Sequence, residues 1–363
     1  MPVPIWTLKM SKGILSETNS LKPFGLFLYF LTFVAKIYQF LINTRNKRYK
    51  LKSKFISGSK IISVGNITLG GTGKTPLVAW IANYFAQKDQ NVGIVLRGYG
   101  RKNKIKEPIL HGVDFKNNEL ETFGDECLLL SELCPHAKIM VCADRIKGIQ
   151  RLEKEQNCSI IILDDGFQQL HIEKQMDIIC LDYVKPFGNG YVLPRGNLRE
   201  PLVELNRASH YVFSKGTPRK RALNKLKELV GDAKEIFFCD YVIIGGYMLN
   251  DRLNVVDLNG LKNQNVLILS AIGDPDSFQG MLNRFDIYGE VMAFPDHFDF
   301  KRSDIERVNR YVEDNDIDSI IITEKDAQKL KGNHFKIPCC VIEAEIRPSR
   351  EFEEELDYNI LRK

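Results

Sequence analysis

The feature that most constrains the fold is a glycine-rich segment between two apolar stretches. Residues 61–64 are apolar except for Ser63 and predict a buried strand, and residues 77–85 have the apolar periodicity of a helix. Between them, Gly70, Gly71 and Gly73 precede Lys74 and Thr75. Glycines let backbone N–H groups turn toward an anion, and a helix N-terminus adds partial positive charge. The segment predicts a phosphate-binding P-loop, and the alternative is a merely flexible turn.

The expected nucleotide contacts lie in residues 68–75. Lys74 would reach the terminal phosphates of a bound nucleotide, and the Thr75 hydroxyl would ligate Mg²⁺. One position departs from the usual spacing, which places a glycine five residues before Gly73, where this chain has Thr68. The nucleotide-binding residues predicted here are Thr68, Leu69, Gly70, Gly71, Thr72, Gly73, Lys74 and Thr75.

Apolar strands and helices alternate after this loop, which predicts a doubly wound parallel sheet of the α/β class. Further short apolar runs beyond residue 207 predict a second, smaller α/β unit, and the charged stretch 350–363 is expected to be peripheral. The expected strands are 92–96, 138–142, 159–163, 177–182, 211–214, 236–239, 266–270, 291–294 and 319–323, with helices over 124–134 and 144–156. The domains predicted are an extension (1–21), a membrane-associating helix with a basic segment (22–54), a nucleotide-binding domain (55–215) and a smaller closing domain (216–363).

Three aspartates are candidates for the chemistry of this site. Asp164 and Asp165 end the expected strand 159–163, and carboxylates at the carboxyl ends of parallel strands face bound ligands. They predict a magnesium site opposite the P-loop, the alternative being a solvated acidic turn. Asp125 lies at the start of a helix, where it could be an N-cap or a carboxylate near the transferred phosphoryl group. The residues alone do not separate these two readings of Asp125.

Basic residues and one histidine complete the candidate set. Arg97, Arg145 and the arginines of loop 195–199 follow expected strands or lie in turns, where arginine binds phosphate oxygens in pairs. The alternative is ordinary solvated surface charge. His297 follows the strand expected at 291–294 within Phe-Pro-Asp-His-Phe, but a lone histidine is more often structural than catalytic.

The N-terminal region contains an apolar stretch, residues 24–42, followed directly by basic residues between 45 and 54. This pattern favours a helix lying in the interface on the cytoplasmic side of a membrane. The alternative is a hydrophobic helix packed on the rest of the protein. The eight cysteines form no Cys-x-x-Cys pair and predict buried, reduced thiols. The net charge of +5 is modest, and no nucleic-acid partner is expected.

Together these segments resemble the tetraacyldisaccharide 4'-kinase family, the lipid A 4'-kinases of Gram-negative bacteria. The matching segments occur in the family's order. The sequence departs from the family pattern in two places. Many members have histidine where this chain has Gln169, and His171 follows two positions later. Arg195 and Asn197 stand where alanine and proline are more common. The matching segments are 63–66, 70–76, 96–100, 124–126, 143–145, 164–168, 188–190, 198–201, 294–297 and 323–326.

The resemblance implies transfer of the γ-phosphate of ATP to the 4'-hydroxyl of an acylated glucosamine disaccharide 1-phosphate, with Mg²⁺. It also implies that Asp125 and His297 form a catalytic dyad, brought together from two domains. It places the protein at the cytoplasmic face of the bacterial inner membrane, peripheral or monotopic, and leaves the oligomeric state open. The alternatives are a kinase for another acceptor and a membrane-docked nucleotide switch that hydrolyses ATP or GTP without an acceptor. An Asn-Lys-x-Asp guanine-recognition element is missing from the sequence, which weakens the GTPase alternative.

Overall fold

The computed structural model describes residues 22–70, 72–99, 101, 105, 107–111, 119–214, 216, 218–232, 234–273, 275–295 and 298–362. Within these residues, thirteen strands form one continuous sheet that passes through both halves of the molecule. The strand order is β11-β10-β12-β13-β8-β7-β6-β1-β5-β2-β4-β3, and β9 pairs with β8. The α/β class is therefore confirmed, and the sheet continues from one predicted unit into the other through one antiparallel pair, β8 with β13.

The N-terminal half is built on parallel strands with helices on both faces. β4, β2, β5, β1, β6 and β7 pair in parallel, while short β3 pairs antiparallel with β4. Side chains of α2 and α4 join one hydrophobic cluster with one face of β1, and α5 joins another cluster on the opposite face. The bounds are β1 (Lys60–Gly65), α2 (Lys74–Ala86), β2 (Val92–Leu96), β3 (Ile109–Leu110), α3 (Glu119–Phe123), α4 (Asp125–Leu133), β4 (Lys138–Val141), α5 (Arg145–Gln156), β5 (Ile160–Asp164), β6 (Met176–Asp182), η1 (Leu202–Arg207), β7 (His210–Ser214) and α6 (Lys220–Val230).

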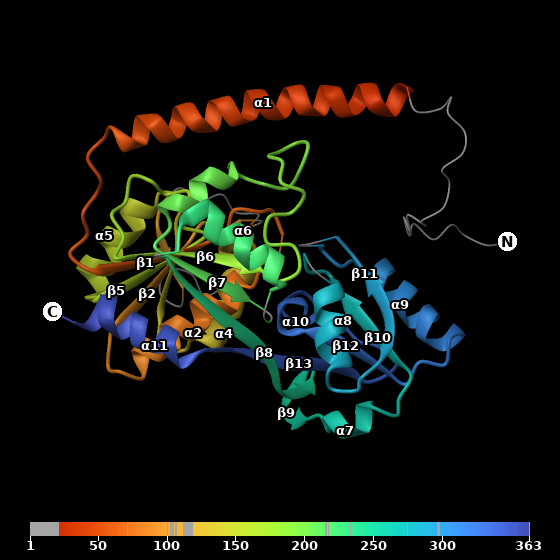
Figure 1. The fold of residues 1–363 in the computed structure, drawn as a ribbon. Coiled ribbons are helices and arrows are strands. Elements are labelled where there is room, and N and C mark those ends of the chain that lie inside the picture. The colour runs from red at the N-terminus through yellow and green to blue at the C-terminus, as the bar shows by residue number, and fades with distance from the viewer. Residues whose placement is uncertain are drawn as a thin grey trace.

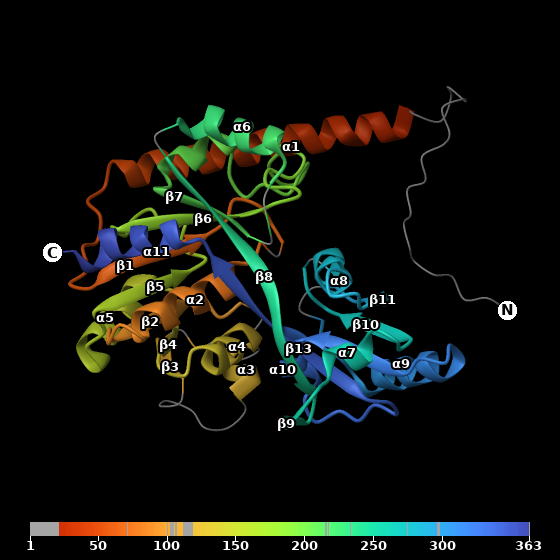
Figure 2. The ribbon, with the colours of Figure 1, turned by 60° about the horizontal axis from the view of Figure 1, so that its bottom comes forward.

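Two long strands connect the halves. β8 (Glu235–Met248) continues the parallel sheet beside β7, and its later residues pair antiparallel with β13 (Cys339–Pro348). Figures 1 and 2 show β8 and β13 running side by side from one half into the other. Beyond them lie β9 (Asp251–Val255), α7 (Leu258–Leu261), β10 (Val266–Ser270), α8 (Pro275–Asn283), β11 (Gly289–Ala293), α9 (Arg302–Asp314), β12 (Ser319–Thr323) and α10 (Glu324–Leu330).

The C-terminal segment returns to the N-terminal half. It forms α11 (Arg350–Leu356) and η2 (Asp357–Leu361), and Phe352, Leu356 and Ile360 are buried in the cluster that contains α2. The Phe352 ring lies 6.0 Å from that of Trp80. The prediction that 350–363 is peripheral is therefore wrong, because the charged residues of this segment alternate with apolar ones that cover the core.

Helix α1 (Lys22–Lys50) runs along one side of the N-terminal half (Figure 1). Ala35 and Ile42 are buried, and the Tyr38 hydroxyl donates to the carbonyl of Arg199 at 2.9 Å. Other apolar side chains on it face solvent, including Tyr29 at 77% and Phe40 at 69% exposed. The helical stretch 27–50 is long and apolar enough to cross a membrane. Only 6% of its apolar 18-residue part is buried inside the protein. The helix thus packs by a narrow stripe and leaves most of its apolar surface uncovered.

Candidate active site

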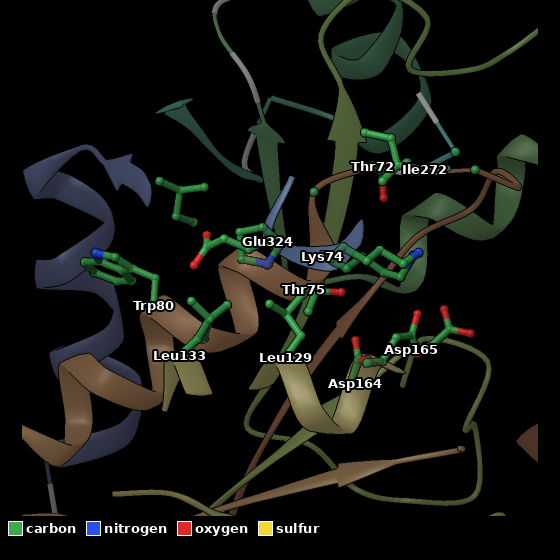
Figure 3. A pocket seen from close by; sticks show the side chains of 18 of the residues that line it. Thr72, Lys74, Thr75, Trp80, Leu129, Leu133, Asp164, Asp165, Ile272 and Glu324 are labelled. Carbon is green, nitrogen blue, oxygen red and sulfur yellow. The ribbon is translucent and has the colours of Figure 1, made fainter. Parts of the chain in front are cut away.

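A cavity of about 1450 Å³ lies between the two halves and is lined by residues from both. The P-loop, the ends of β5 and α4, strands β8 and β13, and α8 all contribute to its walls. Tyr38, Ile42 and Arg45 of α1 line it as well, so the cavity extends to the helix with the exposed apolar surface. Figure 3 shows Lys74, Thr75, Asp164 and Asp165 on one side of it, and Trp80 and Glu324 on the other.

The predicted P-loop joins β1 to α2, as the sequence indicates. Gly73 is the N-cap of α2 and has a left-handed backbone conformation, with φ 77°. A Cβ atom there would lie 2.9 Å from Cβ of Ser214, so only glycine fits without a shift. The Thr72 carbonyl accepts a hydrogen bond from the Ser214 hydroxyl at 2.7 Å, which fixes the loop against β7. Gly71 lies outside the described residues.

A distant segment holds the first part of this loop in place. The Leu69 N–H donates to the carbonyl of Asn197, and the Arg199 N–H donates to that of Ile67, both at 2.7 Å. Thr68 and Leu198 form an antiparallel bridge between these hydrogen bonds. The backbone of 197–199 therefore supports the loop at the position where glycine is replaced by Thr68. Sequence reasoning weighed phosphate neutralisation against solvated surface charge for loop 195–199 and did not predict this clamp.

Asp164 and Asp165 are neighbours with different surroundings. Asp164 is 5% exposed, and its Oδ1 is buried with no hydrogen-bond partner among the described residues. Burial raises the pKa of its carboxyl to about 7, Glu126 adds to the rise, and Lys74 opposes it. Both oxygens of Asp165 accept hydrogen bonds from Nη1 of Arg199 at 2.7 Å. Burial alone would raise the pKa of Asp165, but Lys74 and Arg199 outweigh it, and the pKa lies below its usual value.

The predicted phosphate-binding arginines occupy the cavity wall in different ways. Arg145 is 2% exposed, and its Nη1 and Nη2 donate to the carbonyls of Cys142 and Asp164 at 2.7 and 2.9 Å. Burial lowers the pKa of its guanidinium to about 10. Its Nε is buried without a hydrogen-bond partner in the described part of the chain. Arg145 thus supports the strand end that carries Asp164, and both it and Arg97 line the cavity.

Asp125 is the first residue of α4, and Gly124 is its N-cap, so the N-cap reading of Asp125 is wrong. Its Oδ1 accepts a hydrogen bond from the Glu126 N–H at 3.0 Å, and its Oδ2 lies 3.4 Å from Nζ of Lys329. The cavity lining includes Glu126 but not Asp125, which is 6% exposed. His297 lies outside the described residues, so the dyad stays a prediction.

Glu324 is a cavity-lining carboxylate that sequence reasoning did not single out, although it falls in the matched segment 323–326. Burial raises the pKa of its carboxyl to about 7, and the charge of Glu343 adds to the rise. Arg252 bridges the halves nearby, with ion pairs to Glu343 at 3.0 Å and to Glu132 of α4 at 3.5 Å. No short sequence pattern predicts this cluster, because its residues come from separate elements (α4, β9, α10 and β13) in both halves of the molecule.

Comparison with known proteins gives one consistent result. The family model described as tetraacyldisaccharide-1-P 4'-kinase matches residues 27–361. A tetraacyldisaccharide 4'-kinase of Halothermothrix orenii is 32% identical, covering 85% of this chain and 84% of its own length. A tetraacyldisaccharide 4'-kinase of Coxiella burnetii is also 32% identical, and the match covers 81% of this chain and 80% of that protein. A crystal structure of LpxK from Aquifex aeolicus in complex with ATP has a TM-score of 0.67 and 28% identity, covering 95% of this chain and 98% of that one.

Proposed function

Because the chain belongs to the tetraacyldisaccharide-1-P 4'-kinase family, we propose that the cavity between the halves carries out that family's reaction. The enzyme transfers the γ-phosphoryl group of ATP to the 4'-hydroxyl of tetraacyldisaccharide 1-phosphate in lipid A biosynthesis. The acceptor 4'-oxygen bonds to the γ-phosphorus, the bond to the β–γ bridging oxygen breaks, and ADP leaves. The structural observation that supports this function is that the P-loop opens into a cavity that extends to α1.

The P-loop end binds the triphosphate. Backbone N–H groups around Gly73 and the N-terminus of α2 face the anion, and Lys74 places a positive charge beside it. Arg97 and Arg145 add positive potential to the same wall of the cavity. Arg145 also donates a hydrogen bond to the carbonyl of Asp164 at the end of β5. These residues stabilise the negative charge that spreads over the transferred phosphoryl oxygens.

A magnesium ion fits this end of the cavity. Asp164 offers a buried oxygen without a hydrogen-bond partner in the described residues, and the Thr75 hydroxyl lines the same wall. No cluster of three or more histidine, cysteine, aspartate or glutamate residues in the described ranges is arranged to hold a metal. Mg²⁺ suits such a site because it takes one or two carboxylates and completes its shell with phosphate oxygens and water. We expect Asp164 and Thr75 to ligate it, and Asp165 to remain with Arg199.

The proton of the sugar hydroxyl needs an acceptor, because a neutral hydroxyl is a poor nucleophile near pH 7. Asp125 and His297 are proposed for this role from the family resemblance. Asp125 comes from α4 of the N-terminal half, and His297 follows β11 in the C-terminal half. Contact between the halves would then assemble the dyad and exclude water from the γ-phosphate.

The lipid acceptor is proposed to reach the cavity along α1. The exposed apolar side chains of this helix favour insertion into one leaflet, and the basic residues at its C-terminal end favour the anionic cytoplasmic surface. We therefore expect a peripheral or monotopic protein at the cytoplasmic face of the inner membrane. Deleting residues 1–43 should move the protein into the soluble fraction, and persistent membrane binding would point to a second anchoring surface.

The function is tested with γ-labelled ATP, Mg²⁺ and tetraacyldisaccharide 1-phosphate in detergent micelles. The label should appear at the 4' position of the disaccharide. His297→Ala should slow this transfer with little loss of ATP binding by calorimetry, and His334→Ala serves as the control. Label found only in free phosphate, with turnover independent of lipid, would support the nucleotide-switch alternative.

A further inference from the structure

Lys329 of α10 reaches Asp125 of α4 across the contact between the two halves. The two helices pack against each other, and Nζ of Lys329 lies 3.4 Å from Oδ2 of Asp125. Their side chains are only 9% and 8% exposed. Nζ has no hydrogen-bond partner among the described residues, although an ammonium group carries three donors. Such a buried, poorly satisfied cation contributes little to stability, so its placement points to a role in the site.

The position of α10 is fixed within the C-terminal half. The N–H of Asp326 donates to the Thr323 side chain at 3.1 Å, and the Thr323 hydroxyl donates back to Asp326 Oδ2 at 2.8 Å. Oδ1 of Asp326 accepts a hydrogen bond from the N–H of Ala271 at 3.1 Å, just after β10. Asp326 is fully buried and ties α10 to two strands. Lys329, one turn later on the same helix, therefore moves with the C-terminal half.

The carboxylate of Asp125 is contacted from both halves. Its Oδ1 accepts from the N–H of Glu126 in its own helix, and its Oδ2 faces Lys329. We propose that Lys329 is a positioning residue that sets the orientation of the Asp125 carboxylate for phosphoryl transfer. Because Lys329 belongs to the C-terminal half, this orientation is reached only when the halves are in contact. The inference rests on the proposed catalytic role of Asp125.

The test compares Lys329→Met with Lys329→Arg in the full-length protein, using the micellar kinase assay. Met removes the charge at similar length, and Arg retains it. A misplaced reacting group costs up to about 100-fold, so Lys329→Met should lower kcat about 10- to 100-fold. The KM values for ATP and lipid should change less than about threefold, because ground-state binding is left intact. Lys329→Arg should recover most of kcat. Lys331→Met, an exposed lysine just after α10, is the matched control and should behave like the wild type.

A double-mutant cycle with Asp125→Asn separates this role from a merely structural one. If Lys329 acts through Asp125, adding Lys329→Met to Asp125→Asn should cost less than about twofold further in kcat. An equal loss in both backgrounds overturns the proposal, as does a Lys329→Met kcat within twofold of the wild type. A fall in melting temperature shared by the Met and Arg variants, with no recovery of kcat by Arg, also overturns it. A wild-type protein that leaves the disaccharide unlabelled contradicts the proposed function instead.

Discussion

At the phosphate end of the cavity (residues 68–75, Asp164, Asp165 and Arg199), backbone and side-chain hydrogen bonds within the N-terminal half hold the loop and the strand end. At the linker end (Glu132, Arg252, Glu324 and Glu343), charged side chains from both halves meet instead. Because the hydrogen bonds named for the P-loop come from the N-terminal half, we expect the loop to stay formed when the C-terminal half moves. Side-chain ion pairs across the halves exist only when the halves are in contact. The proposed nucleotide site and the proposed meeting of the catalytic groups thus depend on different parts of the molecule.

The largest effect is expected from Lys74→Ala at the phosphate end. Removing a charge directed at the developing phosphoryl oxygens should lower kcat/KM for ATP about 10²- to 10³-fold. The melting temperature should stay close to that of the wild type, because the clamp on the loop is backbone-mediated. Steady-state kinetics and thermal scans check both points, with exposed Lys60→Ala on β1 as the control. Unfolding of the variant would break the distinction between the two ends.

Asp164→Asn and Asp165→Asn should separate two neighbouring carboxylates. Asp164→Asn removes a proposed magnesium ligand and should lower kcat about 100-fold. In the absence of nucleotide at pH 8, the same change should raise the stability of the protein, because it removes a buried charge. Asp165→Asn leaves Nη1 of Arg199 facing a neutral amide in place of a carboxylate and should lower stability by about 1–3 kcal/mol. Asparagine tolerates the left-handed backbone of residue 165, where φ is 54°. Urea unfolding at pH 8 is the measurement. Stability changes of the same sign in both variants would contradict the structure.

Gly73→Ala tests whether the loop backbone is as rigid as its clamps suggest. The new methyl group would meet Ser214 in a left-handed conformation, at a cost of about 1–3 kcal/mol. ATP affinity measured by calorimetry should fall with stability, because the N-terminus of α2 shifts. The control is Gly280→Ala in α8, where a Cβ meets nothing within 4 Å and the helix should gain slightly. Unchanged ATP affinity in Gly73→Ala would mean that the loop adapts easily.

The last expected effect concerns the linker end and is seen only as a change of stability with pH. The pKa of Glu324 is 4.5 when unperturbed and about 7 in the folded protein, so between these values the folded state binds more protons than the unfolded one. Stability should therefore fall as pH rises through this window, by up to about 3 kcal/mol from this group. Glu324→Gln should flatten that fall in the free energy of unfolding between pH 4.5 and 7. A slope equal to that of the wild type would assign the pH dependence to other groups, Asp164 first.

Local patterns predicted much of the fold. Apolar runs gave β1, β2, β5, β10 and β12 to within a residue or two, and the glycine segment placed the loop before α2. All eight cysteines are buried and free, as their apolar contexts indicate. The family membership also followed from short segments in a fixed order. Each of these features depends on residues close together in the chain, where periodicity and turn chemistry act.

Contacts between distant segments could not be predicted from such local patterns. The clamp of 197–199 on the P-loop, the return of α11 to the α2 face and the pairing of Arg199 with Asp165 join residues far apart in sequence. The predicted boundary at residue 215 stays a prediction, while Leu226, Phe237 and Cys239 pack in the clusters of the N-terminal half. No local pattern records which face of a helix will meet which strand.

By itself, therefore, the sequence determined the α/β class, the position of the phosphate-binding loop and the family, because these depend on short-range spacing. Only the tertiary structure decided which carboxylate keeps a buried oxygen without a hydrogen-bond partner in the described residues and which is bound by arginine. It also decided that a lysine of the C-terminal half meets Asp125. The physical reason is that desolvation and ion pairing depend on what surrounds a side chain in space, and identical aspartates in adjacent positions then acquire different chemistry.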